Sequence, residues 1–159
     1  MSRVVVEVKW AHLSESGPPY PKSKSLTAAQ AAGRRFEKKV ARAVCRAAAR
    51  AGFAAFCGQW IAFEDAEGYG MAQPDIFLRD GARIVLIEAK LTQTDRAWDQ
   101  MEKLYVPLLR SVYSKGSRVR TIQTCQRVRA AAQQVPLLTL HKAIHLDKPG
   151  RFLLHLPLL

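Results

Sequence analysis

Residues 73–90 read QPDIFLRDGARIVLIEAK, and this stretch decides the fold that we expect. Two apolar runs, 76–78 and 84–87, flank the dipeptide Asp80-Gly81. An Asp-Gly pair between two runs of β-forming residues is typical of a tight turn that joins antiparallel strands. The stretch therefore predicts a β-hairpin with buried strands.

Charged residues stand at the open end of this hairpin. Asp75 precedes the first strand, and Glu88-Ala89-Lys90 end the second. Because side chains alternate between the faces of a strand, Glu88 and Lys90 point the same way. Two carboxylates and an ammonium group are costly to bury unless they bind something, and carboxylate oxygens are natural ligands of a hard divalent cation. We therefore expect a cation site here.

The charge balance of the chain points to a polyanionic partner. Its 159 residues, enough for one domain, include 25 Lys and Arg against 13 Asp and Glu, so the net charge is +12. Such a surplus favours nucleic acid first and an anionic membrane surface second. No stretch approaches the ~18 apolar residues of a membrane span, and no signal peptide is visible at the N-terminus.

An amphipathic helix is predicted from Thr27, a plausible N-cap, to Gly52. Glu37 falls within an apolar stripe of this helix, which contains Gly33, Val40, Ala41, Val44 and Ala48. The opposite face carries Arg35, Lys38, Lys39, Arg42, Arg46 and Arg50. Glu37 is either a third acid that faces the cation site or a structural residue, paired with Arg34 or lying at the stripe edge. The basic face is either solvated or in contact with nucleic acid, with Arg35 and Lys38 as candidates.

The remaining elements complete an α-β-β-β-α-β order. Strands are expected at 4–10, 53–64, 118–128 and 152–156, a turn at 68–70, a loop at 14–25, and a second helix from Thr92 or Thr94 to about Ser114. We expect one domain over 1–159, with a core at about 26–130, an N-terminal strand and linker at 1–25, and an apolar tail at 131–159. The apolar ends either complete the sheet or form a self-association surface.

Several further polar residues are candidates for binding. Lys115, Arg118 and Arg120 could contact phosphates or form an ordinary solvated edge. His141 and His145, four residues apart, have a spacing that suits zinc on one helix face, but no third ligand is evident. Cys45, Cys57 and Cys125 are widely spaced, which argues against a disulfide framework or a thiolate zinc site and fits a reducing cytoplasm.

Taken together, Glu37 in a helix, Pro74-Asp75 and Glu88-x-Lys90 resemble the PD-(D/E)xK nuclease superfamily over about residues 33–128. The resemblance implies an α/β fold with a restriction-endonuclease-like core, in which helices flank a central mixed sheet. It implies that Asp75, Glu88 and the carbonyl of Ala89 bind Mg²⁺ or Mn²⁺. Lys90 would orient or deprotonate the attacking water, or stabilise charge on the phosphate, and Glu37 would hold a water near the metal or a second metal.

The resemblance leaves the branch of the superfamily open. Small size, basic surplus and the helix start at Gly33 favour Holliday-junction resolvases or small viral and mobile-element endonucleases, which suggests a homodimer acting on branched DNA. The exonuclease branch has a Gln-x-x-x-Tyr motif after the lysine, whereas here Tyr105 follows Gln100 by five residues. In an α-helix this spacing turns Tyr105 away from Gln100 and argues against an exonuclease. Gln100 is either a substrate contact or a solvated helix position.

The sequence thus predicts a metal-dependent DNA endonuclease in the cytoplasm, with Glu37, Asp75, Glu88 and Lys90 as its catalytic residues. An exonuclease of the same superfamily, a non-catalytic basic nucleic-acid-binding module and an RNA substrate are the alternatives.

Overall fold

The computed structural model describes residues 3–19, 25–128 and 135–156. Its elements are β1 (Trp10–Ser14), α1 (Ala28–Arg50), β2 (Ala54–Cys57), β3 (Trp60–Asp65), β4 (Gly68–Ala72), β5 (Ile76–Asp80) and β6 (Arg83–Thr92), followed by α2 (Asp95–Gln100), the π-helical turn η1 (Met101–Tyr105), α3 (Val106–Val112), β7 (Arg118–Arg127), β8 (Leu137–Leu138), α4 (Leu140–Ile144) and β9 (Arg151–Leu154).

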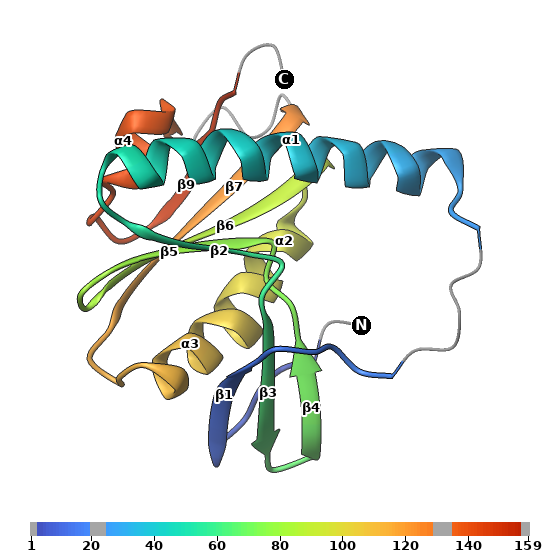
Figure 1. Cartoon of the computed structure of the whole chain (residues 1–159), viewed down its shortest axis with the longest axis vertical. Helices are drawn as coiled ribbons and strands as arrows, with labels where there is room; N and C mark the ends of the chain where they lie inside the picture. Colours follow the sequence, from blue (N-terminus) through green and yellow to red (C-terminus); the bar gives the residue numbers. More distant parts are fainter. Residues whose placement is uncertain (1–2, 20–24, 129–134, 157–159) are drawn as a thin grey trace.

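The central sheet has the strand order β2-β5-β6-β7-β9-β8. Strands β2, β5 and β6 pair antiparallel, whereas β6, β7, β9 and β8 pair parallel, so the sheet is mixed. Helix α1 lies across one face, and α2 and α3 lie on the other (Figure 1). The expected α/β class with a mixed sheet between helices is confirmed, and α1-β2-β5-β6-α2-β7 has the expected order.

Alternation along the central strands creates two hydrophobic clusters. Val85 and Ile87 of β6 face α1 and pack with its buried Phe36, Val40, Val44 and Ala48. Ile84 and Leu86 face the other way and pack with Trp98, Met101, Leu108 and Leu109 of the α2-η1-α3 segment. At full burial each such side chain contributes about 1.5–3 kcal/mol, so both helical layers are held to the sheet by apolar contact.

Local signals explain where the main elements begin and end. The Thr27 hydroxyl accepts a hydrogen bond from the backbone N–H of Gln30 (3.2 Å), and the Gln30 side chain accepts one from the N–H of Thr27 (2.9 Å). This capping box starts α1 where the sequence predicts it. Gly52, after the helix, has φ +79°, and Gly81 in the β5–β6 turn has φ +58°. Both are left-handed conformations that glycine adopts without strain.

A second sheet, in the order β1-β3-β4, was not expected as a separate unit. The predicted strand 53–64 is in fact two strands, since Gly58 has φ +62° between β2 and β3 and these strands join different sheets. The predicted turn 68–70 lies within β4. The small sheet projects from the large one in Figure 1, and its Ile61 and Phe63 pack into the cluster below the central sheet.

The predicted strand 4–10 is wrong, because β1 begins at Trp10. Glu7 has φ +52°, and the backbone around it pairs with two different segments: the Val5 N–H donates to Lys103 O (3.0 Å), and the Lys9 N–H donates to Glu64 O (2.8 Å). At the other end of the chain, β8 and β9 extend the central sheet, so the apolar tail completes the core as far as residue 154. Residues 157–159 lie outside the described part.

The cysteine prediction is also corrected. Cys45 on α1 and Cys57 at the end of β2 form a disulfide, and Cys125 is free and buried. Spacing in the sequence could not reveal the pair, because the two residues meet only when the chain turns back after α1. The cysteines therefore give no support to a reducing compartment. In the described residues we find no helix with the length and apolar character needed to span a membrane.

Candidate active site

The antiparallel register of the hairpin brings Asp75 and Glu88 together. Ile76 of β5 lies opposite Ile87 of β6, so the residues just beyond them, Asp75 and Glu88, face each other at the end of the strands. The N–H of Ala89 donates to Asp75 Oδ2 (2.8 Å), and Lys90 Nζ donates to Glu88 Oε1 (2.8 Å). The structure thus assembles Asp75, Glu88 and Lys90 as the sequence predicts.

Glu88 is the least satisfied polar group of this site. Its side chain is buried, and Oε2 has no hydrogen-bond partner among the described residues. Loss of solvent, and secondarily the negative charge of Asp75, raises the pKa of Glu88 to about 7, despite the opposing ammonium of Lys90. Burial likewise raises the pKa of Asp75, although the Ala89 N–H and Lys90 oppose it. The two acids therefore lack the positive charge that would hold both ionised.

Lys90 responds to the same two acids. Burial lowers the pKa of its ammonium group, but the charge of Glu88 and the hydrogen bond to it outweigh burial and raise the pKa overall. Lys90 is therefore a cation that donates a hydrogen bond, and its side chain keeps about a third of its surface exposed (35%). It lines two cavities, one of about 520 Å³ on the α1 side and one of about 350 Å³ on the α2 side.

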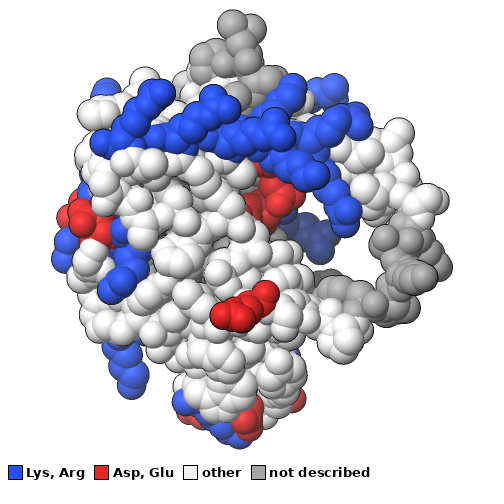
Figure 2. All heavy atoms as spheres, viewed as in Figure 1, with Lys and Arg blue, Asp and Glu red and all other residues white. Residues whose placement is uncertain are grey.

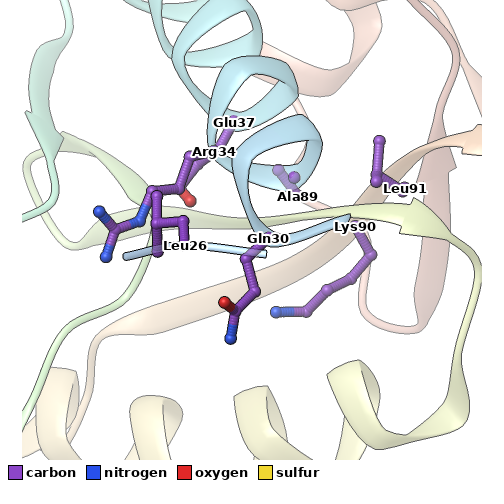
Figure 3. A pocket seen from close by; sticks show the side chains of 8 residues that line it. Leu26, Gln30, Arg34, Glu37, Ala89, Lys90 and Leu91 are labelled. Atoms are coloured by element: carbon purple, nitrogen blue, oxygen red, sulfur yellow. The ribbon is translucent and has the colours of Figure 1, made fainter. Parts of the chain in front are cut away.

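Glu37 reaches the site from α1. Together with Gln30, Arg34, Ala89 and Lys90 it lines the larger cavity, and Figure 3 shows these side chains extending from α1 and β6 around one space. Burial and the charge of Asp75 raise the pKa of Glu37, against the cations Lys90, Arg34 and Lys38. The predicted third acid thus faces the cavity, and the alternative ion pair with Arg34 is not seen in the described chain.

The acids do not form a three-carboxylate cage. Within the described residues, no group of three or more Asp, Glu, His or Cys side chains gathers closely enough to hold a metal ion. Glu37 therefore stands apart from the Asp75–Glu88 pair. A cation here would take its protein ligands from Asp75 and Glu88, with the Ala89 carbonyl expected from the resemblance as the third. The unpartnered Glu88 Oε2 fits such an ion, because carboxylate oxygens are preferred ligands of hard divalent cations.

The second helical segment overturns one sequence inference. Tyr105 is not turned away from Gln100: the Gln100 amide donates to Tyr105 Oη (2.6 Å), and Tyr105 Oη donates to the Gln73 carbonyl (3.1 Å). The π turn η1 causes this, since its hydrogen bonds link residues five apart, as Val106 N–H does to Met101 O. Tyr105 therefore anchors the backbone two residues before Asp75. The spacing of Gln100 and Tyr105 no longer argues against an exonuclease.

The predicted basic residues fall into two groups. Arg35 and Lys38 are exposed on α1, and Figure 2 shows Lys and Arg forming a band over this helix, with acidic atoms in a recess beneath it. Lys115, Arg118 and Arg120 lie elsewhere, because Arg118 pairs in register with Arg83, at the opposite end of β6 from Glu88. Five residues of strand, roughly 16 Å, separate the Arg118 level from the Glu88 level. Arg118 and Arg120 instead pair with Asp147 (3.1 and 3.5 Å).

One supporting residue, Gln123, carried no sequence signal. Gln123 is buried opposite Glu88 in the β6–β7 register. Its side-chain oxygen accepts from the N–H of Thr94 (2.9 Å), and its amide donates to the Thr94 carbonyl (3.0 Å). This fixes the start of α2 next to the site.

His141 and His145 lie close together (ring centroids 4.7 Å), and His145 packs against the edge of Phe53. They belong to no three-residue metal group in the described chain.

Comparison with family models, curated proteins and solved structures found no match for this chain. The functional assignment therefore depends on the residues and geometry given above.

Proposed function

We propose that the protein is a metal-dependent nuclease that hydrolyses phosphodiester bonds in DNA, and that it cuts as an endonuclease. The observation that carries the proposal is the buried Glu88 carboxylate, with one oxygen unpartnered and Asp75 facing it. Lys90 compensates this buried charge only in part, and a divalent cation would neutralise the remainder. Asp75, Glu88 and Lys90 resemble the motif of the PD-(D/E)xK superfamily. This resemblance suggests that such a cation would take part in phosphodiester hydrolysis.

Each residue has a role that follows from its position. Asp75 and Glu88 would hold Mg²⁺ or Mn²⁺, which when bound neutralises charge on the phosphate and lowers the pKa of a water. Lys90, a partly exposed cation that lines both cavities, would donate a hydrogen bond to the scissile phosphate or orient the attacking water. Glu37, with its raised pKa, would exchange a proton with a water in the larger cavity.

The surroundings of the site support a polyanionic substrate. Figure 2 shows a band of Lys and Arg over α1 with acidic atoms beneath it, and Arg35 and Lys38 are among the exposed cations of this helix. A polyanion would be attracted to this face by the basic band. DNA, preferably branched, is the proposed substrate, and a homodimer and a cytoplasmic location belong to the same proposal. Lys115, Arg118 and Arg120 would contact only parts of the substrate distant from the cut.

One observation favours exonuclease activity as a second candidate. Gln100 and Tyr105 are five residues apart, and the π turn brings them into hydrogen-bond contact. In an α-helix, a Gln and a Tyr would be this close at a spacing of four residues. In the exonuclease branch of the superfamily that the sequence resembles, the Gln-x-x-x-Tyr motif follows the catalytic lysine.

The test is a cleavage panel in Mg²⁺ or Mn²⁺ that compares a four-way junction, a linear duplex, a flap and a single strand. Wild type is compared with Glu88→Gln and with Glu15→Gln. Glu15 is exposed, and its substitution makes the same chemical change outside the site. We expect internal cuts, lost in Glu88→Gln and kept in Glu15→Gln. Degradation from ends would select the exonuclease, and binding without cleavage by all three proteins would leave a non-catalytic binding module.

A further inference from the structure

Two cavities meet at Lys90, one on each side of the end of β6. The larger, about 520 Å³, lies against α1 and is lined by Arg34. The smaller, about 350 Å³, lies against α2 and is lined by Arg96. Both volumes are in the range of ligand-binding pockets. Because Lys90 lines both, a ligand that contacts its ammonium group can extend into either cavity.

Each cavity is lined by one arginine that forms no ion pair within the part of the chain that the structure describes. Neither Arg34 nor Arg96 forms an ion pair with a carboxylate of residues 3–19, 25–128 or 135–156. Arg83, Arg118 and Arg151 each pair with an acidic side chain, whereas Arg35 and Arg79, like Arg34 and Arg96, form no ion pair among the described residues. Arg34 and Arg96 differ from Arg35 and Arg79 because they line the cavities beside Lys90. The two arginines that flank Lys90 are therefore available for an anion that comes from outside the chain.

Both arginines are exposed and lie on helices that build the site. Arg34 lies one helical turn before Glu37 on α1, and both residues line the larger cavity. Arg96 follows the N-cap of α2, where its backbone N–H donates to Thr94 Oγ1 (3.3 Å), and Gln123 holds Thr94 in turn. Neither position depends on a long loop.

From this arrangement we infer that Arg34 and Arg96 bind the phosphates on the two sides of the scissile phosphate, one in each cavity. The inference rests on the proposed nuclease function and narrows its substrate to a strand that continues in both directions from the cut. Guanidinium groups suit this task, because they donate paired hydrogen bonds to phosphate oxygens. A strand that spans both cavities is cut internally.

A tetranucleotide is the sharpest probe, because only its central phosphate has a phosphate on each side. We expect wild type with Mn²⁺ to cut it in the middle and release dinucleotides. A neutral methylphosphonate in place of either outer phosphate should slow cleavage about tenfold, the effect of one lost charge-assisted contact. Arg34→Gln should become insensitive to one of these replacements, and Arg96→Gln to the other.

Arg79→Gln is the matched control, since Arg79 lies at the far end of β5 and stacks over Tyr113 (4.4 Å to the ring centroid). Binding of the same tetranucleotide is measured with Ca²⁺ by fluorescence anisotropy. Each site variant should weaken it about tenfold and reduce the salt slope by about 0.7, while the control does not.

The outcomes separate this inference from the proposed function. If wild type does not cleave any nucleic acid but the variants change binding as expected, the nuclease proposal fails and the two phosphate sites stand. If wild type cleaves while Arg34→Gln and Arg96→Gln behave like Arg79→Gln, the phosphate sites are wrong and the nuclease stands. Release of a terminal mononucleotide from the tetranucleotide would also overturn the two-sided arrangement.

Discussion

Asp65 and Glu88 are both fully buried carboxylates, exposed by 0% and 1%, yet their surroundings are opposite. Asp65, at the end of β3 in the small sheet, forms an ion pair with Arg3, whose Nε donates to Oδ2 (3.2 Å), and accepts from the N–H of Glu67 (2.9 Å). Loss of solvent raises the pKa of Asp65, but the Arg3 and Glu67 hydrogen bonds outweigh it and lower the pKa overall. Glu88 accepts a hydrogen bond from Lys90 at Oε1, whereas its Oε2 has no hydrogen-bond partner among the described residues, and its pKa is raised to about 7.

The difference separates a structural charge from a functional one. A buried ion with all its partners joins segments of the chain, as Asp65 joins the N-terminal segment to the small sheet. A buried ion that lacks a hydrogen-bond or charge partner within the chain is typical of a site where a ligand or metal ion provides that partner. The comparison therefore supports our proposal that a cation binds at the end of the central sheet.

The largest effect is expected from Glu88→Gln. Removing the charge that would hold the metal should lower cleavage about a thousandfold, the equivalent of several kcal/mol of transition-state stabilisation. The same substitution should not lower the free energy of unfolding at pH 8, because it removes a buried charge that Lys90 compensates only in part. Urea unfolding measures the second quantity. Cleavage at the wild-type rate, or a marked loss of stability, would make Glu88 a structural residue like Asp65.

Arg3→Ala tests the other half of the comparison and should give the largest loss of stability. It leaves Asp65 buried with its backbone donor but without its cation, and a buried charge that loses one partner is strongly destabilising. Thermal and urea unfolding should both show the loss, and Asp65→Asn in the Arg3→Ala background should recover part of it. Stability equal to wild type would mean that Asp65 is not held by this ion pair.

Metal binding should depend on pH in the direction set by Glu88. The pKa of Glu88 is raised in the folded state. Glu88 therefore contributes its full stabilisation below about pH 4.5, and this stabilisation is lost as the pH rises through about 7. A cation that replaces the missing positive charge should therefore stabilise the protein more at pH 8 than at pH 5, where protons compete for the carboxylate. At a hundred times its Kd, Ca²⁺ should add about 2.7 kcal/mol at pH 8. Equal shifts at both pH values, or the same shift in Glu88→Gln, would place the ion elsewhere.

Much of this site could be predicted from the sequence because its determinants are local. The Asp80-Gly81 turn fixes the register of two apolar strands, and that register alone places Asp75 beside Glu88. The position of Glu37 in the apolar stripe of α1 follows from helical periodicity in the same way. The capping residues Thr27 and Thr94 were also found, since a cap is recognised within one turn of chain.

What the sequence did not reveal depends on contacts between distant segments. The break between β2 and β3, the second sheet and the Cys45–Cys57 disulfide all arise from where strands pair, which no single stretch encodes. The π turn at Met101–Tyr105 adds one residue to a helix that looks regular in the sequence. Arg118 and Arg120 show the same limit: their charges suggest phosphate contacts, but parallel pairing puts them at the other end of the sheet beside Asp147.

The smallest effect is expected from Tyr105→Phe. It removes the hydroxyl that links Gln100 to the Gln73 carbonyl, which should cost about 1 kcal/mol of stability and, by loosening the chain before Asp75, about tenfold in cleavage rate. Tyr113→Phe is the control, since the buried Tyr113 hydroxyl has no hydrogen-bond partner in the described chain. Urea unfolding and single-turnover cleavage measure the two effects. Equal behaviour of the two variants would show that the π turn does not position Asp75.

The most direct test of the comparison is an NMR titration of the Glu88 carboxyl carbon, assigned by its absence in Glu88→Gln. We predict a midpoint near pH 7 without metal, as burial and Asp75 require, and a clear fall of the midpoint when Mg²⁺ is added. A midpoint near the ordinary glutamate value of about 4.3, unmoved by Mg²⁺, would contradict the account, because Glu88 would then be as well compensated as Asp65.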